Sequence, residues 1–294
     1  MSASPPAPAT MSIVFGSHTD VGKRRENNED SSRCGRLGTG TAHEGTLLVV
    51  SDGVGGLKAG EIASRLAVDN LHALLGERLA RETPPADRRG WIDAAMRETD
   101  RRIRAAAQQP GMSGMGATLS LLWFEDGHAW WGQAGDSRTY LFRDHVLRQL
   151  SHDQSPVGRL LAEGDLTEKD ARVHPLRHVI DQCLGGSGAA LDPQTGLLDL
   201  AAGDVFLLCS DGLSDGLWDH EIAGILKSAA AGEPPEAVAR TLVNRANEAS
   251  GKDNITAVVA RVEWNPGDKR PAATGSGLGR LLGRLGFGRP AKAG

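Results

Sequence analysis

Residues 46–60, TLLVVSDGVGGLKAG, decide how the rest of the chain is interpreted. An apolar run at residues 47–50 ends in Ser51-Asp52-Gly53, and the pair Gly55-Gly56 follows. This pattern predicts a buried strand that carries a carboxylate at its end and leads into a tight turn. A buried carboxylate needs a partner or a metal ion to offset its lost hydration. Residues 205–209, VFLLC, also run into a Ser-Asp-Gly triplet, so we expect two carboxylates to meet at one place.

The order of the other patterns indicates the fold class. Stretches with strand and helix periodicity come in blocks: strands, a helix pair, many strands, a second helix pair and a last strand. Such blocks favour a layered α+β domain over alternating units with a parallel sheet. We expect a strand at residues 12–18, helices at 62–75 and 91–106, an antiparallel meander at 118–124, 127–134, 138–142 and 146–150, helices at 157–163 and 167–173, strands at 179–183, 195–200 and 205–209, helices at 221–229 and 235–249, and a strand at 254–262.

The composition of the two ends sets the expected domain boundaries. Residues 1–11 are expected to form a disordered Pro/Ala-rich leader, residues 12–264 the compact domain, and residues 265–294 a flexible Gly/Arg-rich tail. Leucines within residues 278–285 of the tail have the spacing of a basic amphipathic helix, but the intervening glycines favour disorder. The polar run KRRENNEDSS at residues 23–32 is typical of a solvated loop.

Composition and charge exclude several classes of protein. With 294 residues, 39% hydrophobic and 24% charged, the chain has enough material for a sizeable core, in one large domain or two small ones. A net charge of -4 gives no basic footprint, so nucleic acid is not expected as a partner. No apolar run approaches the length of a membrane span, and residues 1–10 do not resemble a signal peptide. The three cysteines have no metal-type spacing, so we expect reduced thiols and a cytoplasmic protein. We also expect a monomer.

Five aspartates stand at predicted strand ends beside glycine, asparagine or serine. Any one of them alone is more commonly a turn residue. Five in one domain, two of them after nearly identical apolar strands, point instead to a shared site, where cations would have to separate the mutually repelling carboxylates. An all-oxygen set of ligands suits Mg²⁺ or Mn²⁺ better than zinc. The five are Asp30, Asp52, Asp136, Asp211 and Asp253.

These motifs carry a resemblance to a known family. They include Arg25-Glu26-Asn27-Asn28-Glu29-Asp30, Ser51-Asp52-Gly53-Val54-Gly55-Gly56, Gly116-Ala117-Thr118, Gly135-Asp136-Ser137-Arg138, Ser210-Asp211-Gly212 and Asp253-Asn254. Over residues 12–263 their order resembles the metal-dependent serine/threonine protein phosphatases of type 2C, in their bacterial branch. The resemblance implies a four-layer α-β-β-α sandwich, in which two central antiparallel sheets are flanked by helix pairs.

The resemblance also implies a metal site. Asp52 would bridge two Mg²⁺ or Mn²⁺ ions, with the Gly53 carbonyl as a further ligand. Asp211 and Asp253 would complete the shell of the first ion, and a third, weaker ion would lie between Asp136 and Asp211. Glu29 and Asp30 would support the second ion. The implied metal set is therefore Glu29, Asp30, Asp52, Gly53, Asp136, Asp211 and Asp253.

Three further features follow from the resemblance. Arg25 would bind the substrate phosphate, because a planar guanidinium matches two phosphate oxygens. Asn254 would orient the shell around Asp253. Residues 151–188 would form the flap segment, which shapes substrate choice. Val54 stands where many animal members have a histidine that protonates the leaving group, so that proton would have to come from a metal-bound water or from a flap histidine, His152 or His174.

The implied reaction is hydrolysis of phosphoserine and phosphothreonine in proteins by a phosphoric monoester hydrolase. A metal-bridging hydroxide would attack phosphorus directly, with no phosphoenzyme. No cysteine is followed six residues later by an arginine, as a cysteine phosphatase loop would require. The enzyme is expected to oppose a bacterial serine/threonine kinase. Two alternatives remain open, a non-catalytic phosphoprotein-binding scaffold of the same fold and a phosphatase for small esters.

Overall fold

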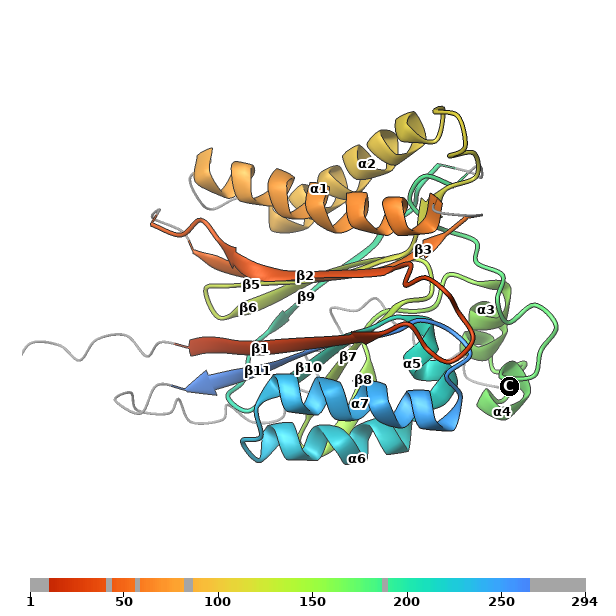
Figure 1. Cartoon of the computed structure of the whole chain (residues 1–294). Helices are drawn as coiled ribbons and strands as arrows, with labels where there is room; N and C mark the ends of the chain where they lie inside the picture. Colours follow the sequence, from red (N-terminus) through yellow and green to blue (C-terminus); the bar gives the residue numbers. More distant parts are fainter. Residues whose placement is uncertain (1–10, 41–43, 56–58, 82–86, 187–189, 265–294) are drawn as a thin grey trace, which may run out of the picture.

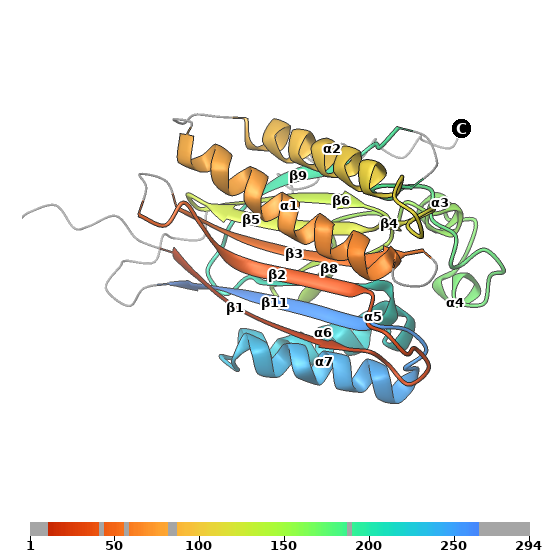
Figure 2. The same cartoon turned by 45° about the horizontal axis from the view of Figure 1, so that its top comes forward.

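The computed structural model describes residues 11–40, 44–55, 59–81, 87–186 and 190–264. Two antiparallel sheets lie face to face between two pairs of helices (Figure 1). Helices α1 and α2 cover the outer face of one sheet, and α6 and α7 cover the outer face of the other, as the turned view also shows (Figure 2). The four-layer α-β-β-α sandwich expected from the sequence is therefore confirmed.

The first sheet has the strand order β1-β11-β10-β7-β8, and the second has the order β2-β3-β5-β6-β9, with the short β4 paired to β3. The strands are β1 (Met11–Asp20), β2 (Asp30–Leu37), β3 (Gly45–Val54), β4 (Gly116–Ala117), β5 (Leu119–Glu125), β6 (His128–Ala134), β7 (Arg138–Arg143), β8 (Val146–Gln149), β9 (Gln194–Asp199), β10 (Val205–Cys209) and β11 (Ile255–Trp264). The helices are α1 (Ala59–Arg81), α2 (Arg88–Ala106), α3 (Pro156–Glu163), α4 (Glu168–Ala171), α5 (Asp211–Gly216), α6 (Asp219–Ala230) and α7 (Pro235–Ala249).

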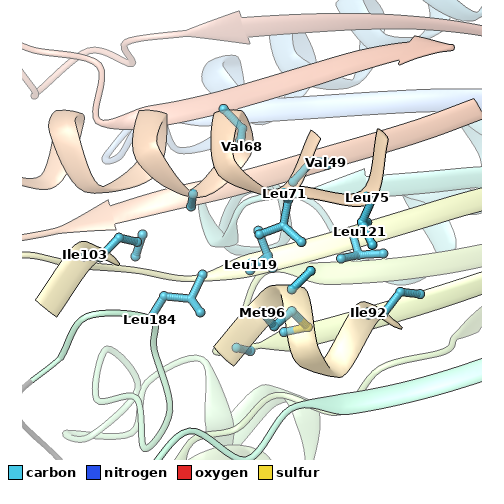
Figure 3. Packing of buried hydrophobic residues seen from close by; sticks show 14 of the residues in the cluster. Val49, Val68, Leu71, Leu75, Ile92, Met96, Ile103, Leu119, Leu121 and Leu184 are labelled. Carbon is cyan, nitrogen blue, oxygen red and sulfur yellow. The ribbon is translucent and has the colours of Figure 1, made fainter. Parts of the chain in front are cut away.

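Three apolar layers hold the sandwich together, and β3 contributes to two of them. Val49 faces α1 and α2, where it joins a cluster with Leu71, Leu75 and Leu121 (Figure 3). Leu48 and Val50 point the other way, into the layer between the sheets. Successive side chains of a strand alternate between its faces, so a strand covered on both sides is apolar throughout. The continuous run at residues 47–50 reflects this position.

The predicted meander over residues 118–150 is wrong as a single sheet. β5 pairs with β6 and β7 pairs with β8, but β6 continues to β9 while β7 lies beside β10. The chain therefore crosses from one sheet to the other at residues 135–137, where Gly135 has a φ of +98°. Periodicity identifies strands but not their partners, and in about one third of cases two consecutive strands are not neighbours in a sheet. The crossing places Asp136 between the two sheets.

Two further predictions need correction. Residues 179–183 form no strand; only the adjacent Leu184 makes an isolated bridge, to Ala117. The polar run at residues 23–32 is a loop only in its first part, because β2 begins at Asp30 and pairs with β3 along its whole length. β2 is an edge strand with many partly exposed side chains, so its sequence lacks the apolar pattern of a strand.

The strands nearest the two expected domain boundaries, β1 and β11, pair with each other. β1 and β11 pair from Met11 with Trp264 to Asp20 with Ile255, so β1 begins one residue before the expected boundary. The rest of the leader and the tail, including the possible helix at residues 278–285, lie outside the described residues. No helix in the described ranges combines the length and apolar character needed to cross a membrane.

A buried ion pair fixes the start of α2 on the second sheet. Arg88 donates two hydrogen bonds of 2.7 Å to the carboxylate of Glu125 at the end of β5. The two side chains are only 5% and 2% exposed. The guanidinium also lies 4.2 Å from the ring centroid of Trp91 and 5.1 Å from that of Trp123. Each charge is compensated by the other, because water does not reach either side chain.

Removing one member of this pair is expected to be costly. Glu125→Ala leaves the Arg88 charge buried without its carboxylate and should lower the free energy of unfolding by about 3–5 kcal/mol, measured by urea denaturation. The double variant Arg88→Met/Glu125→Leu should recover most of that loss. Glu236→Ala, which removes an exposed i,i+4 pair with Arg240, should change stability by about 0.5 kcal/mol or less. A double variant as unstable as Glu125→Ala would contradict this account.

Candidate metal centre

The predicted acidic residues come from several elements, and one of them, Asp211, begins α5, which lies at the same end of the sandwich as α3 and α4 (Figure 1). Asp30 and Asp52 are directly opposite each other in the pairing of β2 with β3. Asp211 is the first residue of α5, immediately after β10, and Asp253 lies two residues before β11. Asp136 lies at the crossing between the sheets. Both sheets thus contribute to one cluster.

The carboxylates of the cluster influence one another's ionisation. The pKa of Asp52 is raised well above its ordinary value by burial first, and then by the charges of Asp30, Asp211, Asp136 and Asp253. Burial is likewise the main cause that raises the pKa of Asp30 to about 6 and that of Asp136 to about 7. Asp211 shows the same upward direction, caused by burial and then by Asp136. Each ionised carboxylate opposes ionisation of the next.

Two oxygens of the cluster fit a bound cation. Oδ1 of Asp30 and Oδ1 of Asp211 are buried and have no hydrogen-bond donor among the described residues. The other oxygen of Asp30 accepts a hydrogen bond of 2.7 Å from the Ser210 hydroxyl. A buried anionic oxygen without a partner is costly, and several such oxygens facing one another match the shell of a hard divalent ion. The residues present therefore fit Mg²⁺ or Mn²⁺.

Each position of the repeated Ser-Asp-Gly triplet has a distinct role. Ser51 donates to the Thr118 carbonyl at 2.6 Å, while Ser210 ties the first sheet to Asp30 of the second. A Cβ added at Gly53 would lie 2.1 Å from the Gly60 carbonyl oxygen, and one at Gly212 would lie 2.1 Å from that of Asn254. Only glycine permits these close backbone approaches. The triplet thus combines a serine hydroxyl that donates a hydrogen bond, a carboxylate, and a glycine that leaves room for another segment of the backbone.

Asn254 joins the loop before β2 to the turn before β11. Its side-chain oxygen accepts from the Glu29 amide at 2.8 Å, and its amide nitrogen donates to the carbonyls of Val21 and Asn27 at 2.9 and 3.0 Å. Its own backbone amide donates to the Asp253 carboxylate at 2.9 Å. These hydrogen bonds connect the turn that carries Asp253 to the loop that carries Glu29. The Glu29 carbonyl in turn accepts from the Gly53 amide.

Arg25 lies at the open rim of the cluster. Its Nη2 donates to Asp253 Oδ2 at 2.8 Å, and the side chain remains 48% exposed. The charges of Glu29 and Asp52 also act on the guanidinium. Arg25 is therefore held at one edge by a carboxylate while much of its planar group faces solvent, where it can contact a bound anion.

The sequence interpretation assigned no role of their own to several residues at this site. Ser210 and Thr118 support it directly, since the Thr118 hydroxyl accepts from the Asp52 amide at 2.9 Å. Asp215 lies one helical turn after Asp211, and its charge raises the pKa of Asp211. This i,i+4 spacing was visible in the sequence, but residues 211–216 were not expected to be helical. No sequence signal pointed to His178, which contributes a ring nitrogen near both aspartates.

The fold and the carboxylate cluster define a metal-dependent protein of the α-β-β-α sandwich class. Comparison with known proteins then identifies the family. The family model for protein phosphatase 2C matches residues 21–258. The chain belongs to the protein phosphatase 2C family.

Several relatives are similar over most of this chain. It is 35% identical over 272 residues to the serine/threonine protein phosphatase PstP of Mycobacterium tuberculosis, covering 92% of this chain and 49% of that protein. The chain thus spans about half the length of that relative. It is also 35% identical to the protein phosphatase PhpP of Streptococcus pneumoniae, covering 85% of this chain and 97% of PhpP. The solved catalytic domain of PstP in complex with two manganese ions is 34% identical, with a TM-score of 0.73, covering 86% of this chain and all of that chain.

The crowded carboxylates should make the metal-free protein less stable at higher pH. In the folded state the pKa values of Asp30 and Asp136 are about 6 and about 7, above the ordinary value of about 3.9. The folded state therefore binds more protons than the unfolded chain, and stability is lost as pH rises through these values. Between about pH 5 and about pH 8, the Tm of the protein in EDTA should fall, as measured by differential scanning calorimetry.

Asp52→Asn provides the matched variant for this prediction, because it removes one repelling charge and keeps the shape of the side chain. In EDTA at about pH 8 it should melt at a higher temperature than the parent protein, and its Tm should depend less on pH. Saturating Mn²⁺ should raise the Tm of the parent protein more than that of the variant. A metal-free variant that melts below the parent protein at every pH would refute the repulsion argument.

Proposed function

We propose that this protein is a serine/threonine protein phosphatase that hydrolyses phosphoserine and phosphothreonine. Membership of the protein phosphatase 2C family supports the proposal, as do relatives named for this activity. The single observation that carries it is the convergence of acidic residues from both sheets on one partly buried cluster with unpartnered oxygens, beside an exposed arginine.

The proposed cofactors are two Mg²⁺ or Mn²⁺ ions, with a third at a weaker site. We assign the first two to Asp52, Gly53, Asp211 and Asp253 together with Glu29 and Asp30, and we include Asp136 with Asp211 in the weaker site. When bound, such ions supply an activated water and neutralise charge on the phosphoryl group. The chain's own part is to hold the carboxylates in place, through Ser210, Thr118 and Asn254.

Arg25 is the proposed phosphate-binding residue. Its contact with Asp253 fixes one edge of the guanidinium next to the carboxylate cluster, while the exposed part of the side chain can donate to phosphate oxygens. A planar, permanently charged donor in this position orients the substrate and compensates charge on the phosphoryl group as it transfers. Asn254 would act indirectly, by keeping the loop that carries Arg25 against the turn of Asp253.

Direct attack by water, without a phosphoenzyme, agrees with the state of the thiols. Burial raises the pKa of Cys34 and of Cys209 to about 12, and it also raises that of Cys183. All three are therefore protonated near neutral pH and are poor nucleophiles. They are also free of disulfides, which supports the proposed cytoplasmic location.

Phosphorylated proteins are the proposed substrates, with a serine/threonine kinase as the opposing enzyme. The proposed catalytic domain covers residues 12–264, and the flap segment at residues 151–188 would shape substrate choice. Within it, α3 and α4 lie at the same end of the sandwich as α5, the helix that begins at Asp211 (Figure 1). Monomeric state stays a prediction.

Hydrolysis of p-nitrophenyl phosphate with Mn²⁺ tests the proposal first. Activity should appear with Mn²⁺, disappear with EDTA and be abolished in Asp52→Ala. A folded protein that binds phosphopeptides without turnover would support the scaffold alternative. In the second arm, phosphoserine and phosphothreonine peptides should have a higher kcat/KM than small phosphate esters; the reverse order would favour the small-ester alternative.

Arg25→Ala should lower kcat/KM for a phosphopeptide by about 10- to 100-fold, the effect of losing charge-assisted hydrogen bonds of about 1.5–3 kcal/mol. Steady-state kinetics with Mn²⁺ would measure this. The neighbouring exposed residue provides the control, since Arg24→Ala removes the same charge from the loop and should change kcat/KM little. Arg25→Lys should restore only part of the activity, because it keeps the charge and loses the planar group. Equal losses in both alanine variants would contradict the assigned role.

A further inference from the structure

The flap segment carries most of the large apolar side chains that the described part of the chain exposes to solvent. Four such side chains are exposed in the described ranges, and three of them, Val173, Leu176 and Val179, lie in the flap segment. Their exposed fractions are 76%, 46% and 43%. The fourth is Val146, on β8. Single exposed apolar residues are common, but several in one place indicate an interaction surface, here called the flap patch for its three residues.

The backbone of the flap patch is ordered by turns. The Val179 amide donates to the Leu176 carbonyl at 3.0 Å. The Cα atoms at the two ends of such a turn are less than about 7 Å apart, so Leu176 and Val179 are neighbours. An overlapping turn is closed by the Arg177 amide, which donates to the His174 carbonyl at 3.2 Å. The apolar side chains are therefore exposed on a folded segment.

Both ends of this segment are fixed to the rest of the protein. Immediately before it, Arg172 donates to the carbonyls of Asp215 and Leu217 at 3.1 and 2.7 Å. Shortly after it, the Asp181 amide donates to the Gln154 carbonyl at 2.7 Å. A surface that is ordered before a partner arrives loses less conformational entropy on binding. The flap patch is thus prepared for a contact.

The flap patch lies near Asp211 of the carboxylate cluster. His178 stands between Leu176 and Val179, and one of its ring nitrogens lies within 4.8 Å of one carboxylate oxygen of Asp211 and one of Asp215. An extended peptide spans about 3.3–3.6 Å per residue. A peptide whose phosphorylated residue occupies the cluster can therefore reach the flap patch with a residue only a few positions away.

Size and charge favour a substrate peptide over other occupants of the flap patch. A stable interface between two protein copies buries about 1,200–2,000 Å² in total, and three partly exposed aliphatic side chains provide only a fraction of that area. The flap segment contains four basic and six acidic residues, and its net charge of -2 does not favour an anionic membrane surface. A small apolar surface beside the site suits a transient contact with one side chain of a substrate.

We propose that the flap patch binds an aliphatic side chain of the phosphoprotein substrate, a few residues away from the phosphorylated serine or threonine. This inference rests on the proposed function and adds to it a preferred class of substrate sequence. Arg25 and the carboxylate cluster interact with the phosphate, which every substrate shares. The flap patch distinguishes substrates by a neighbouring residue, because contact between two apolar surfaces removes both from water.

Binding of phosphonate peptides to the full chain with Mn²⁺ tests the inference, because their carbon–phosphorus bond replaces the ester and is not hydrolysed. Each peptide carries one leucine, at a different position within about four residues of the phosphonate, in a background of serine and glycine. Fluorescence anisotropy should give a Kd about 3- to 10-fold lower for leucine at a preferred position than for the background peptide, the effect of partly burying one aliphatic side chain. Leu176→Ser and Val179→Ser should each reduce this preference.

Val146→Ser is the matched control, since it removes a similarly exposed side chain from β8 and should retain the preference. An unchanged Tm in each variant shows that the fold is intact. Equal Kd values for all peptides in the parent protein, or a preference that persists in both Leu176→Ser and Val179→Ser, would overturn the inference.

Two other outcomes would assign the flap patch to a different occupant and also overturn the inference. They are a dimer in sedimentation velocity that is lost in Leu176→Ser, and binding to lipid vesicles that is lost in the same variant. The peptides report binding without turnover, whereas p-nitrophenyl phosphate reports turnover without a peptide. Failure of the inference and failure of the proposed function are therefore distinguishable.

Discussion

The mutual repulsion of carboxylates at one end of the sandwich is the constraint on which the rest of the structure depends. Asp30, Asp52, Asp136 and Asp211 all have raised pKa values, with burial as the first cause and, for Asp52 and Asp211, neighbouring aspartates next. Among the described residues, Arg25 forms an ion pair with Asp253, and the charges of Arg25 and Arg138 lower the pKa values of Asp30 and Asp136 less than burial raises them. The protein therefore concentrates negative charge that its own side chains compensate only in part, and a divalent ion is the simplest way to compensate the rest.

The sandwich can hold this arrangement because its stability comes from elsewhere. Apolar layers lie between each sheet and its helices and between the two sheets. Each fully buried leucine or valine contributes about 1.5–3 kcal/mol relative to an exposed one. The many buried apolar residues therefore offset the unfavourable free energy of crowding carboxylates at one end of the sandwich. The site also depends on the layers being in place, because the Ser210–Asp30 hydrogen bond joins a strand end of one sheet to a strand of the other. Separating the sheets would dismantle the cluster.

The sequence predicted what depends on local patterns. The apolar strands at residues 47–50 and 205–209 were found because both faces of β3 and β10 are buried, and the five aspartates were found because glycine or asparagine follows strand ends. The sequence did not predict features that depend on which strands pair or on which side chains are exposed. β2 is a polar edge strand recognised only by its partner β3, and the change of sheet at Gly135 leaves no periodic signal. His178 lies close to α5, and Arg172 of the same segment donates to the carbonyls of Asp215 and Leu217, more than 40 positions away in the sequence.

The geometry also bears on the choice between an enzyme and a scaffold of the same fold. A protein that only binds phosphorylated partners needs positive charge at its surface, and Arg25 with its neighbours would be enough for that task. It would have no use for unpartnered oxygens at Asp30 and Asp211, which lower the stability of the metal-free fold. Gly53 and Gly212 allow close backbone contacts beside Asp52 and Asp211, the Ser210 hydroxyl donates to the Asp30 carboxylate, and the Thr118 hydroxyl accepts from the Asp52 amide, so all of these features help to keep the carboxylates in place. Many separate features of the fold thus preserve a cluster of carboxylates that is unfavourable by itself. Chemistry that depends on bound metal ions explains why this cluster is present, whereas binding of phosphorylated partners alone does not require it.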